Sequence, residues 1–247
     1  MEQQNKYTQG GDINKSLMGE TQLNLGSCVK EGWALSKRHF YSILQGGLFT
    51  LGVILLLLML IGNYVSTDDL QSPSVSLSFG LNLLFTLVTT PLITALMMMG
   101  ISHSVGLQTT FLGLVKRLVA SAMLIFCALM LGALVNLGLA LYILPGIYLA
   151  MSTGFTLLLL VEKKYRPSQA ILTSMRVFNR YWLPLSQFYI VSFILFIAGL
   201  FTFGIALIWL VPWYLHTKGV LYRTLFGVEV IGQPTSTTDN KDSVFYA

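Results

Sequence analysis

The sequence VILLLLML at residues 53–60 lies at the centre of an apolar run that extends from about residue 43 to residue 65. No Asp, Glu, Lys or Arg interrupts this run. A helix needs about 20 predominantly apolar residues to cross the ~30 Å hydrocarbon core of a bilayer. A transmembrane β-strand would instead be a short segment in which polar and apolar residues alternate. The run therefore predicts a helix that spans a membrane.

The composition of the whole chain extends this interpretation. Of 247 residues, 54% are hydrophobic and only 10% are charged, and the mean hydropathy is +0.70. A soluble globular protein has about 25% charged residues, so this composition excludes that class. We expect an all-α, six-span transmembrane helical bundle made of three helical hairpins. The expected spans lie at about 43–65, 79–101, 118–142, 145–161, 185–203 and 204–222.

The distribution of cations predicts the orientation of the spans. Five of the 15 Lys and Arg residues precede the first span, two follow the second and five follow the fourth. We assign the last three, which include Lys218, to the segment behind the last apolar core. The connections after the first, third and fifth spans contain none, and the first of them contains Asp68 and Asp69. The positive-inside rule then predicts that both termini are cytoplasmic.

The two ends of the chain differ from the apolar region between them. Residues 1–22 and 228–247 are rich in polar side chains and lack apolar periodicity, which is typical of mobile tails. We therefore expect one transmembrane domain over residues 23–227. The net charge of +5 is explained by the cations that set the topology, so we expect no nucleic-acid partner.

Amphipathic stretches precede three of the expected spans. Ile171, Met175, Phe178 and Trp182 recur at helical spacing and form one apolar stripe. The stretches around Trp33 and from residue 111 to 117 resemble it more weakly. We expect these helices to lie in the cytoplasmic interface and to contact anionic lipid headgroups. The residues predicted to make these contacts are Trp33, Lys37, Arg38, Arg176, Arg180 and Trp182.

Polar and small residues inside the spans have two competing interpretations. Thr86, Thr89 and Thr90, just before Pro91, are candidates to line a polar pocket, and interhelical hydrogen bonding is the alternative. Pro91 and Pro212 predict either static kinks or hinges in their helices. Small residues such as Gly132 and Gly138 favour close helix packing.

Patterns typical of catalysis or of cofactor binding do not occur in the sequence. It contains no G-x-S-x-G, no H-E-x-x-H, no Walker A motif and no G-x-G-x-x-G. His39, His103 and His216 are far apart, and we expect His103 in a loop. Cys28 and Cys127 have no metal-ligand spacing. We therefore expect no catalytic residue, no cofactor and no metal. The predicted spans also lack the ionisable side chains that mark proton pathways, which counts against a proton-coupled carrier.

The second half of the chain resembles a group of bacterial membrane proteins. The sequence LPGIYLA at 144–150, an apolar helix that ends at Glu162, and Tyr181-Trp182 carry the resemblance, as does the closing stretch 204–227. These residues resemble the uncharacterised YciC-like family and its relatives, which are grouped with the membrane domain found beside glycerophosphodiesterases. The resemblance implies a multi-span protein of the bacterial cytoplasmic membrane and carries over no catalytic residue.

Three hypotheses for the function follow from the sequence. The leading one is a structural or regulatory membrane component that binds lipids or other membrane proteins. The alternative is a carrier for an uncharged or amphiphilic solute. The third is a membrane enzyme, which would require His103, Asp68 or Asp69 to meet other polar groups in a pocket.

Overall fold

The computed structural model describes residues 6–64, 74–119 and 121–231. Asp68, Asp69 and Lys241 lie outside this part of the chain. The helices are α1 Ile13–Met18, α2 Leu25–Arg38, α3 Phe40–Tyr64, α5 Val75–Ser104, α6 Phe111–Val119, α7 Ala122–Leu141, α8 Ile143–Ser152, α9 Thr156–Glu162, α10 Pro167–Arg180, α11 Trp182–Phe201 and α12 Leu207–Phe226. The strands are β1 Lys6–Gln9 and β2 Val228–Ile231.

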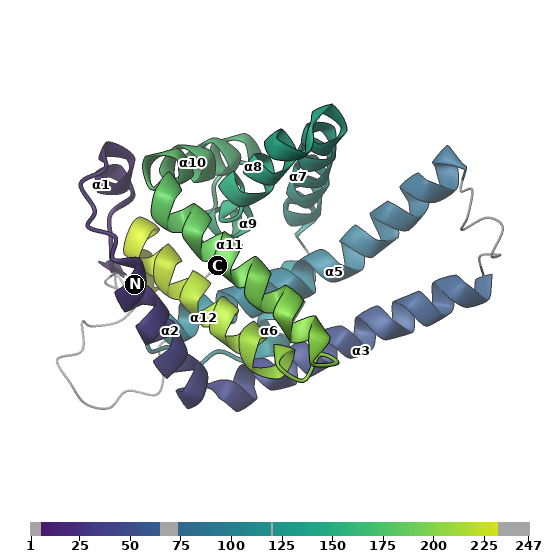
Figure 1. Ribbon diagram of the computed structural model, residues 1–247, viewed down its shortest axis with the longest axis horizontal. Helices are drawn as coiled ribbons and strands as arrows, with labels where there is room; N and C mark the ends of the chain where they lie inside the picture. The colour runs from purple at the N-terminus through teal and green to yellow at the C-terminus, as the bar shows by residue number, and fades with distance from the viewer. Residues whose placement is uncertain (1–5, 65–73, 120, 232–247) are drawn as a thin grey trace, which may run out of the picture.

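Five of the predicted membrane spans are present as apolar helical segments of sufficient length. They are α3, residues Ser76–Ser104 of α5, α7, the α8–α9 segment Ile143–Glu162, and α11. Their hydropathy and length make the chain a multi-span membrane protein with an all-α fold. Figure 1 shows α3 and α5 side by side as a long hairpin that projects from the body of the molecule. The projecting part of α3 exposes large apolar side chains such as Leu55, Leu56 and Met59, as a lipid-facing surface requires.

The sixth predicted span corresponds to α12, which is not among these apolar segments in the described chain. The helix continues without a break to Phe226, and Lys218 lies inside it with only 4% of its surface exposed. The assignment of Lys218 to a segment behind the last span is therefore wrong. The physical reason is that the second half of α12 is buried in protein rather than facing water or lipid.

Close helix contacts surround α12, which packs mainly on α5 and α2. A Cβ atom added to Gly219 would lie 2.4 Å from the backbone oxygen of Gly100, and one added to Gly100 would lie 2.3 Å from the backbone oxygen of Leu215. A Cβ atom on Gly32 in α2 would lie 2.7 Å from the Cα of Thr217. Glycine at these positions lets the backbones of α2, α5 and α12 approach one another more closely than any other residue would allow.

Residues 6–18 of the N-terminal polar segment, where the sequence predicts a mobile tail, contain β1 and α1, and both contact elements of the rest of the chain. Strand β1 pairs in antiparallel register with β2, so that Tyr7 lies opposite Val230. Ser16 in α1 is fully buried and donates a hydrogen bond of 2.6 Å to the backbone oxygen of Leu225. The contacts that order this segment come from the far end of the chain, and local composition does not reveal them.

Three amphipathic segments form helices, as expected, but α10 turns a different face towards the protein. The buried residues of α10 include Ala170, Ser174 and Val177. Ser174 Oγ donates to the backbone oxygen of Ser152 over 2.7 Å, which ties α10 to the end of α8. The predicted apolar stripe is displaced by one residue from this buried face, and Phe178 is the member that both share.

Candidate functional site

Three histidines that are far apart in the sequence meet where α3 begins and α5 ends. His39 caps the end of α2, His103 lies in the last turn of α5, and His216 lies in α12. The rings of His39 and His103 stack with their centroids 4.3 Å apart, and those of His103 and His216 are 5.2 Å apart. The expectation that His103 is a loop residue is wrong, because α5 continues to Ser104 and buries this imidazole.

Hydrogen bonds determine which ring nitrogens carry protons. His216 Nδ1 lies 2.8 Å from the backbone oxygen of Pro212 and 3.1 Å from Ser36 Oγ. A carbonyl oxygen only accepts, so His216 Nδ1 donates to Pro212. In a neutral ring, His216 Nε2 then accepts from His103 Nδ1, which lies 3.0 Å away. Neutral His103 is therefore left with an unprotonated Nε2 that can accept one more hydrogen bond.

His39 is the third member of the cluster and lies between α2 and α3, just before the first apolar helix begins. Burial lowers the pKa of the His39 imidazole, and the neighbouring Arg38 guanidinium lowers it further. His39 is therefore mostly neutral at pH 7 and becomes protonated only at a lower pH than an ordinary histidine. Within the described residues, its imidazole stacks on His103 but makes no hydrogen bond.

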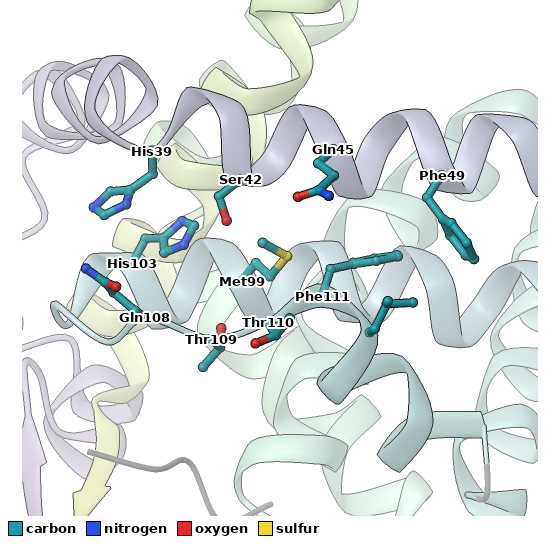
Figure 2. Close-up of a pocket in the computed structure, with 11 residues that line it drawn as sticks. His39, Ser42, Gln45, Phe49, Met99, His103, Gln108, Thr109, Thr110 and Phe111 are labelled. Atoms are coloured by element: carbon teal, nitrogen blue, oxygen red, sulfur yellow. The ribbon is translucent and has the colours of Figure 1, made fainter. Parts of the chain in front are cut away.

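A cavity of about 560 Å³ lies beside the histidines, between α3, α5, the connection 105–110 and the start of α6. Its volume is in the range of small-molecule sites, about 300–1,000 Å³. Figure 2 shows His39, His103 and Gln108 at one end of the cavity, and Phe49 and Phe111 at the other. The cavity therefore has a polar end and an apolar end.

Several polar side chains of the cavity have no hydrogen-bond partner within the described part of the chain. None of the eleven lining residues is Asp, Glu, Lys or Arg. Thr109 Oγ1 is buried without a hydrogen-bond partner, although buried hydroxyls are normally paired. Other polar lining side chains for which the described chain offers no hydrogen-bond partner are Ser42, Gln45, Gln108 and Thr110.

The geometry provides neither a metal site nor an activated nucleophile in the described part of the chain. No group of three His, Cys, Asp or Glu side chains there could hold a metal ion. Ser36 is 2% exposed, and its contact with His216 does not activate it, because His216 Nδ1 already carries a proton. His103 does meet polar groups in a cavity, as the enzyme hypothesis requires, whereas Asp68 and Asp69 lie outside the described residues.

The threonines chosen from the sequence as a polar lining do not face this cavity. Thr89 Oγ1 donates over 2.7 Å to the backbone oxygen of Phe85, one turn earlier in the same helix. Thr90 is buried at 8% exposure, and Thr86 is half-buried. The Thr89 hydroxyl thus forms its hydrogen bond within α5. The sequence suggested instead that it lines a polar pocket or bonds to a neighbouring helix.

The six residues predicted to contact lipid headgroups are all exposed. Lys37 Nζ lies 5.5 Å from the centre of the Trp33 ring, and Arg38 follows it at the end of α2. Arg180 Nη2 donates over 2.7 Å to the backbone oxygen of Met18, so this side chain also holds α1 against α10. The remaining two are Arg176 and Trp182. Contact of these residues with anionic lipid stays a prediction.

An ionisable side chain lies deep inside the bundle at Lys218. Its Nζ lies 5.5 to 5.9 Å from the ring centres of Phe155, Tyr189 and Tyr214, and it forms no ion pair with a described carboxylate. Such rings stabilise a cation through their electron-rich faces. The premise that the spans lack ionisable residues is therefore wrong for α12. The composition of the spans therefore does not count against a proton-coupled carrier.

Comparisons of this chain with protein-family models, with curated proteins and with solved structures give no match. The resemblance to the YciC-like family therefore stays a prediction. The fold and the candidate site are supported by the residues of this chain alone.

Part of the histidine cluster has a signal in the sequence. His39 immediately precedes the first apolar helix, and His103 lies at the end of the second. In a helical hairpin, the first residue of one helix and the last residue of the other lie at the same level. The two histidines could therefore have been placed together, whereas His216 could not, because its depth depends on how α12 packs.

Proposed function

We propose that this protein is a six-span component of the bacterial cytoplasmic membrane that binds an amphiphilic membrane molecule in the cavity beside the three histidines. Both termini lie in the cytoplasm. Helix α11 forms the fifth crossing of the membrane, and α12 forms the sixth. The role is structural or regulatory rather than catalytic. Anionic lipid headgroups surround the exposed basic residues of α2 and α10.

The charge pattern supports this orientation. The connections after α3, α7 and α11 contain no Lys or Arg, whereas α2, α6 and α10 contain several. Cations next to cytoplasmic leaflets are favoured, and translocated connections are depleted of them. In this orientation the start of α3 and the end of α5 are cytoplasmic, so the cavity opens near the cytoplasmic boundary of the bilayer.

The proposal rests on the lining of the cavity, which is polar at one end and apolar at the other. A lipid or other amphiphile at the bilayer boundary has a headgroup and an apolar chain in direct continuity. The cavity places hydrogen-bonding side chains at one end and Phe49 and Phe111 at the other. Pockets of this kind bind through apolar contact, and a few polar groups fix the orientation of the ligand.

We expect that filling the cavity removes the bound amphiphile. Ser42 lines the cavity from α3 and is half-buried, so Ser42→Trp would place an indole in the space that the ligand occupies. The occupancy measured by native mass spectrometry of protein extracted from its own membrane should fall at least about tenfold, which corresponds to ~1.4 kcal/mol of binding free energy.

A matched tryptophan on the same helix serves as the control. Leu51 is 51% exposed and does not line the cavity, so Leu51→Trp should leave the amount of bound amphiphile unchanged. Equal occupancy in Ser42→Trp, Leu51→Trp and the parent protein would refute binding in this cavity.

A carrier for an amphiphilic solute is the second candidate. The observation that favours it is the hydrogen-bonded pair of His103 and His216, which leads from the cavity into the buried part of α12. Reconstituted vesicles distinguish the two functions, because a carrier moves the bound molecule to the other leaflet and a binding component only retains it.

A further inference from the structure

The polar end of the cavity is suited to one class of headgroup. We infer that the bound amphiphile carries an uncharged headgroup with free hydroxyl groups, such as a glycerol or sugar unit without phosphate or carboxylate. This inference rests on the proposed function and names the ligand class of the same cavity. Three observations support it: the absence of charge from the lining, the acceptor on His103, and the unpaired hydroxyl of Thr109.

The first observation is that the lining holds no charged side chain. All eleven lining residues are neutral types or histidines, and Arg38, next to His39, is exposed and does not belong to the lining. A phosphate or carboxylate that entered the cavity would lose water without gaining a cationic partner. Transfer of an unpaired charge out of water is far more costly than transfer of a hydroxyl that finds hydrogen bonds.

The second observation is the unprotonated Nε2 of His103. The chain from Pro212 through His216 makes His103 Nδ1 the donor, so Nε2 is an acceptor in the neutral ring. His103 is a lining residue of the cavity, and an acceptor on a lining residue favours a ligand that donates. A hydroxyl group donates, whereas an ester oxygen or a phosphate diester only accepts.

The third observation is that the remaining polar side chains both donate and accept. Thr109 Oγ1 is buried without a partner, and the amides of Gln45 and Gln108 make no hydrogen bond within the described chain. Each hydroxyl of a glycerol or sugar unit can donate one hydrogen bond and accept others, so adjacent hydroxyls pair fully with such groups. The acyl or alkyl chain would then lie against Phe49 and Phe111.

The test compares four probes with the full-length protein in phosphatidylcholine nanodiscs, with binding measured by native mass spectrometry. The probes are 1-oleoylglycerol, methyl oleate, oleoyl lysophosphatidate and free glycerol. We expect 1-oleoylglycerol to bind at least about tenfold more tightly than methyl oleate and lysophosphatidate, because it alone among these three amphiphiles is both uncharged and able to donate hydrogen bonds. Free glycerol should not be retained, which separates an amphiphile from a soluble polyol.

A pair of threonine variants tests whether the headgroup reaches the predicted polar end. Thr109→Val keeps the shape of the side chain and removes its hydroxyl, so binding of 1-oleoylglycerol should weaken about three- to tenfold, the usual effect of one neutral hydrogen bond. Thr94→Val is the matched control, because Thr94 Oγ1 is also buried and unpaired but does not line the cavity. It should leave the affinity unchanged.

The outcomes separate this inference from the proposed function. Lysophosphatidate or methyl oleate that binds as tightly as 1-oleoylglycerol, with binding still blocked by Ser42→Trp, would overturn the headgroup class and leave the proposed function standing. Insensitivity of every probe to Ser42→Trp would overturn both. An equal loss in Thr94→Val and Thr109→Val would overturn the role of Thr109 and the inferred position of the headgroup.

Discussion

Replacement of Gly219 by alanine is expected to destabilise the folded protein by more than about 3 kcal/mol, beyond the usual cost of overpacking. The added Cβ atom would lie 2.4 Å from the backbone carbon and oxygen of Gly100 and 2.7 Å from the backbone nitrogen of Ile101. Backbone atoms of a packed helix cannot rotate away as a side chain can. The variant should therefore push α12 away from α5 and lower the melting temperature in detergent, measured by intrinsic fluorescence.

Gly132→Ala provides the matched control for this prediction. Gly132 also lies within a helix, and a Cβ atom there would meet nothing within 4 Å. Alanine has a higher helix propensity than glycine by about 1 kcal/mol, so this variant should be neutral or slightly stabilising. Opposite signs for the two glycine-to-alanine changes are expected. Equal melting temperatures would contradict the close contact of α12 with α5.

Loss of the Glu162 carboxylate should have the second largest effect. This carboxylate is buried and accepts hydrogen bonds from Tyr222 Oη over 2.8 Å and from the backbone nitrogen of Glu229 over 2.9 Å. Lys163 Nζ lies 3.4 Å away. Glu162→Ala would leave the fully buried Tyr222 hydroxyl and the Glu229 backbone N–H without their acceptor, and Lys163 would keep only its longer contact with Glu229, which should cost about 3 kcal/mol.

The same carboxylate joins the end of α9 to α12 and to β2, so its loss should also release the small sheet. Faster hydrogen exchange at the backbone amides of β1 and β2, together with a lower melting temperature, is the expected result. Glu20→Ala is the control, because Glu20 is exposed, and it should change neither property. A melting temperature of Glu162→Ala equal to that of the parent protein would show that the buried carboxylate does not hold these elements together.

The apolar helices could be predicted because their signal is local. In α3 and α7, composition and length alone exceed what a membrane span requires, and no distant contact changes that result. The same reasoning did not describe α12. The residues around His216 and Lys218 are buried because Gly32, Gly100 and Gly219 let three helices approach one another, and these glycines come from three distant segments.

Small residues within α7 show the same limit of prediction from the sequence. Gly132 and Gly138 both lie in α7 and both suggested close packing. A Cβ atom on Gly138 would lie 2.7 Å from the side chain of Leu149 in α8, whereas Gly132 faces open space. The type of residue indicates where close approach is allowed, and only the arrangement of neighbouring helices decides where it occurs.

The candidate site was missed for a related reason. A search for motifs looks for chemistry within a short stretch, but His39 and His216 are separated by more than half the chain, and His103 lies far from both in the sequence. The threonines were selected as a polar group at bilayer depth just before Pro91, yet the Thr89 hydroxyl donates its hydrogen bond within its own helix. The polar side chains that do line a cavity lie at the ends of the spans, in and around the connection 105–110.

The most direct test of the central claim asks on which side of the membrane the histidine-lined cavity opens. Single cysteines would be introduced at Gln108, beside the cavity, and at Ser76, at the opposite end of α5, and both positions are exposed. The native Cys28 and Cys127 are buried, so the parent protein provides the background. With a membrane-impermeant maleimide on intact cells, we predict labelling of Ser76→Cys alone, and labelling of Gln108→Cys only after permeabilisation. Labelling of Gln108→Cys in intact cells would contradict a cytoplasmic cavity and the function proposed for it.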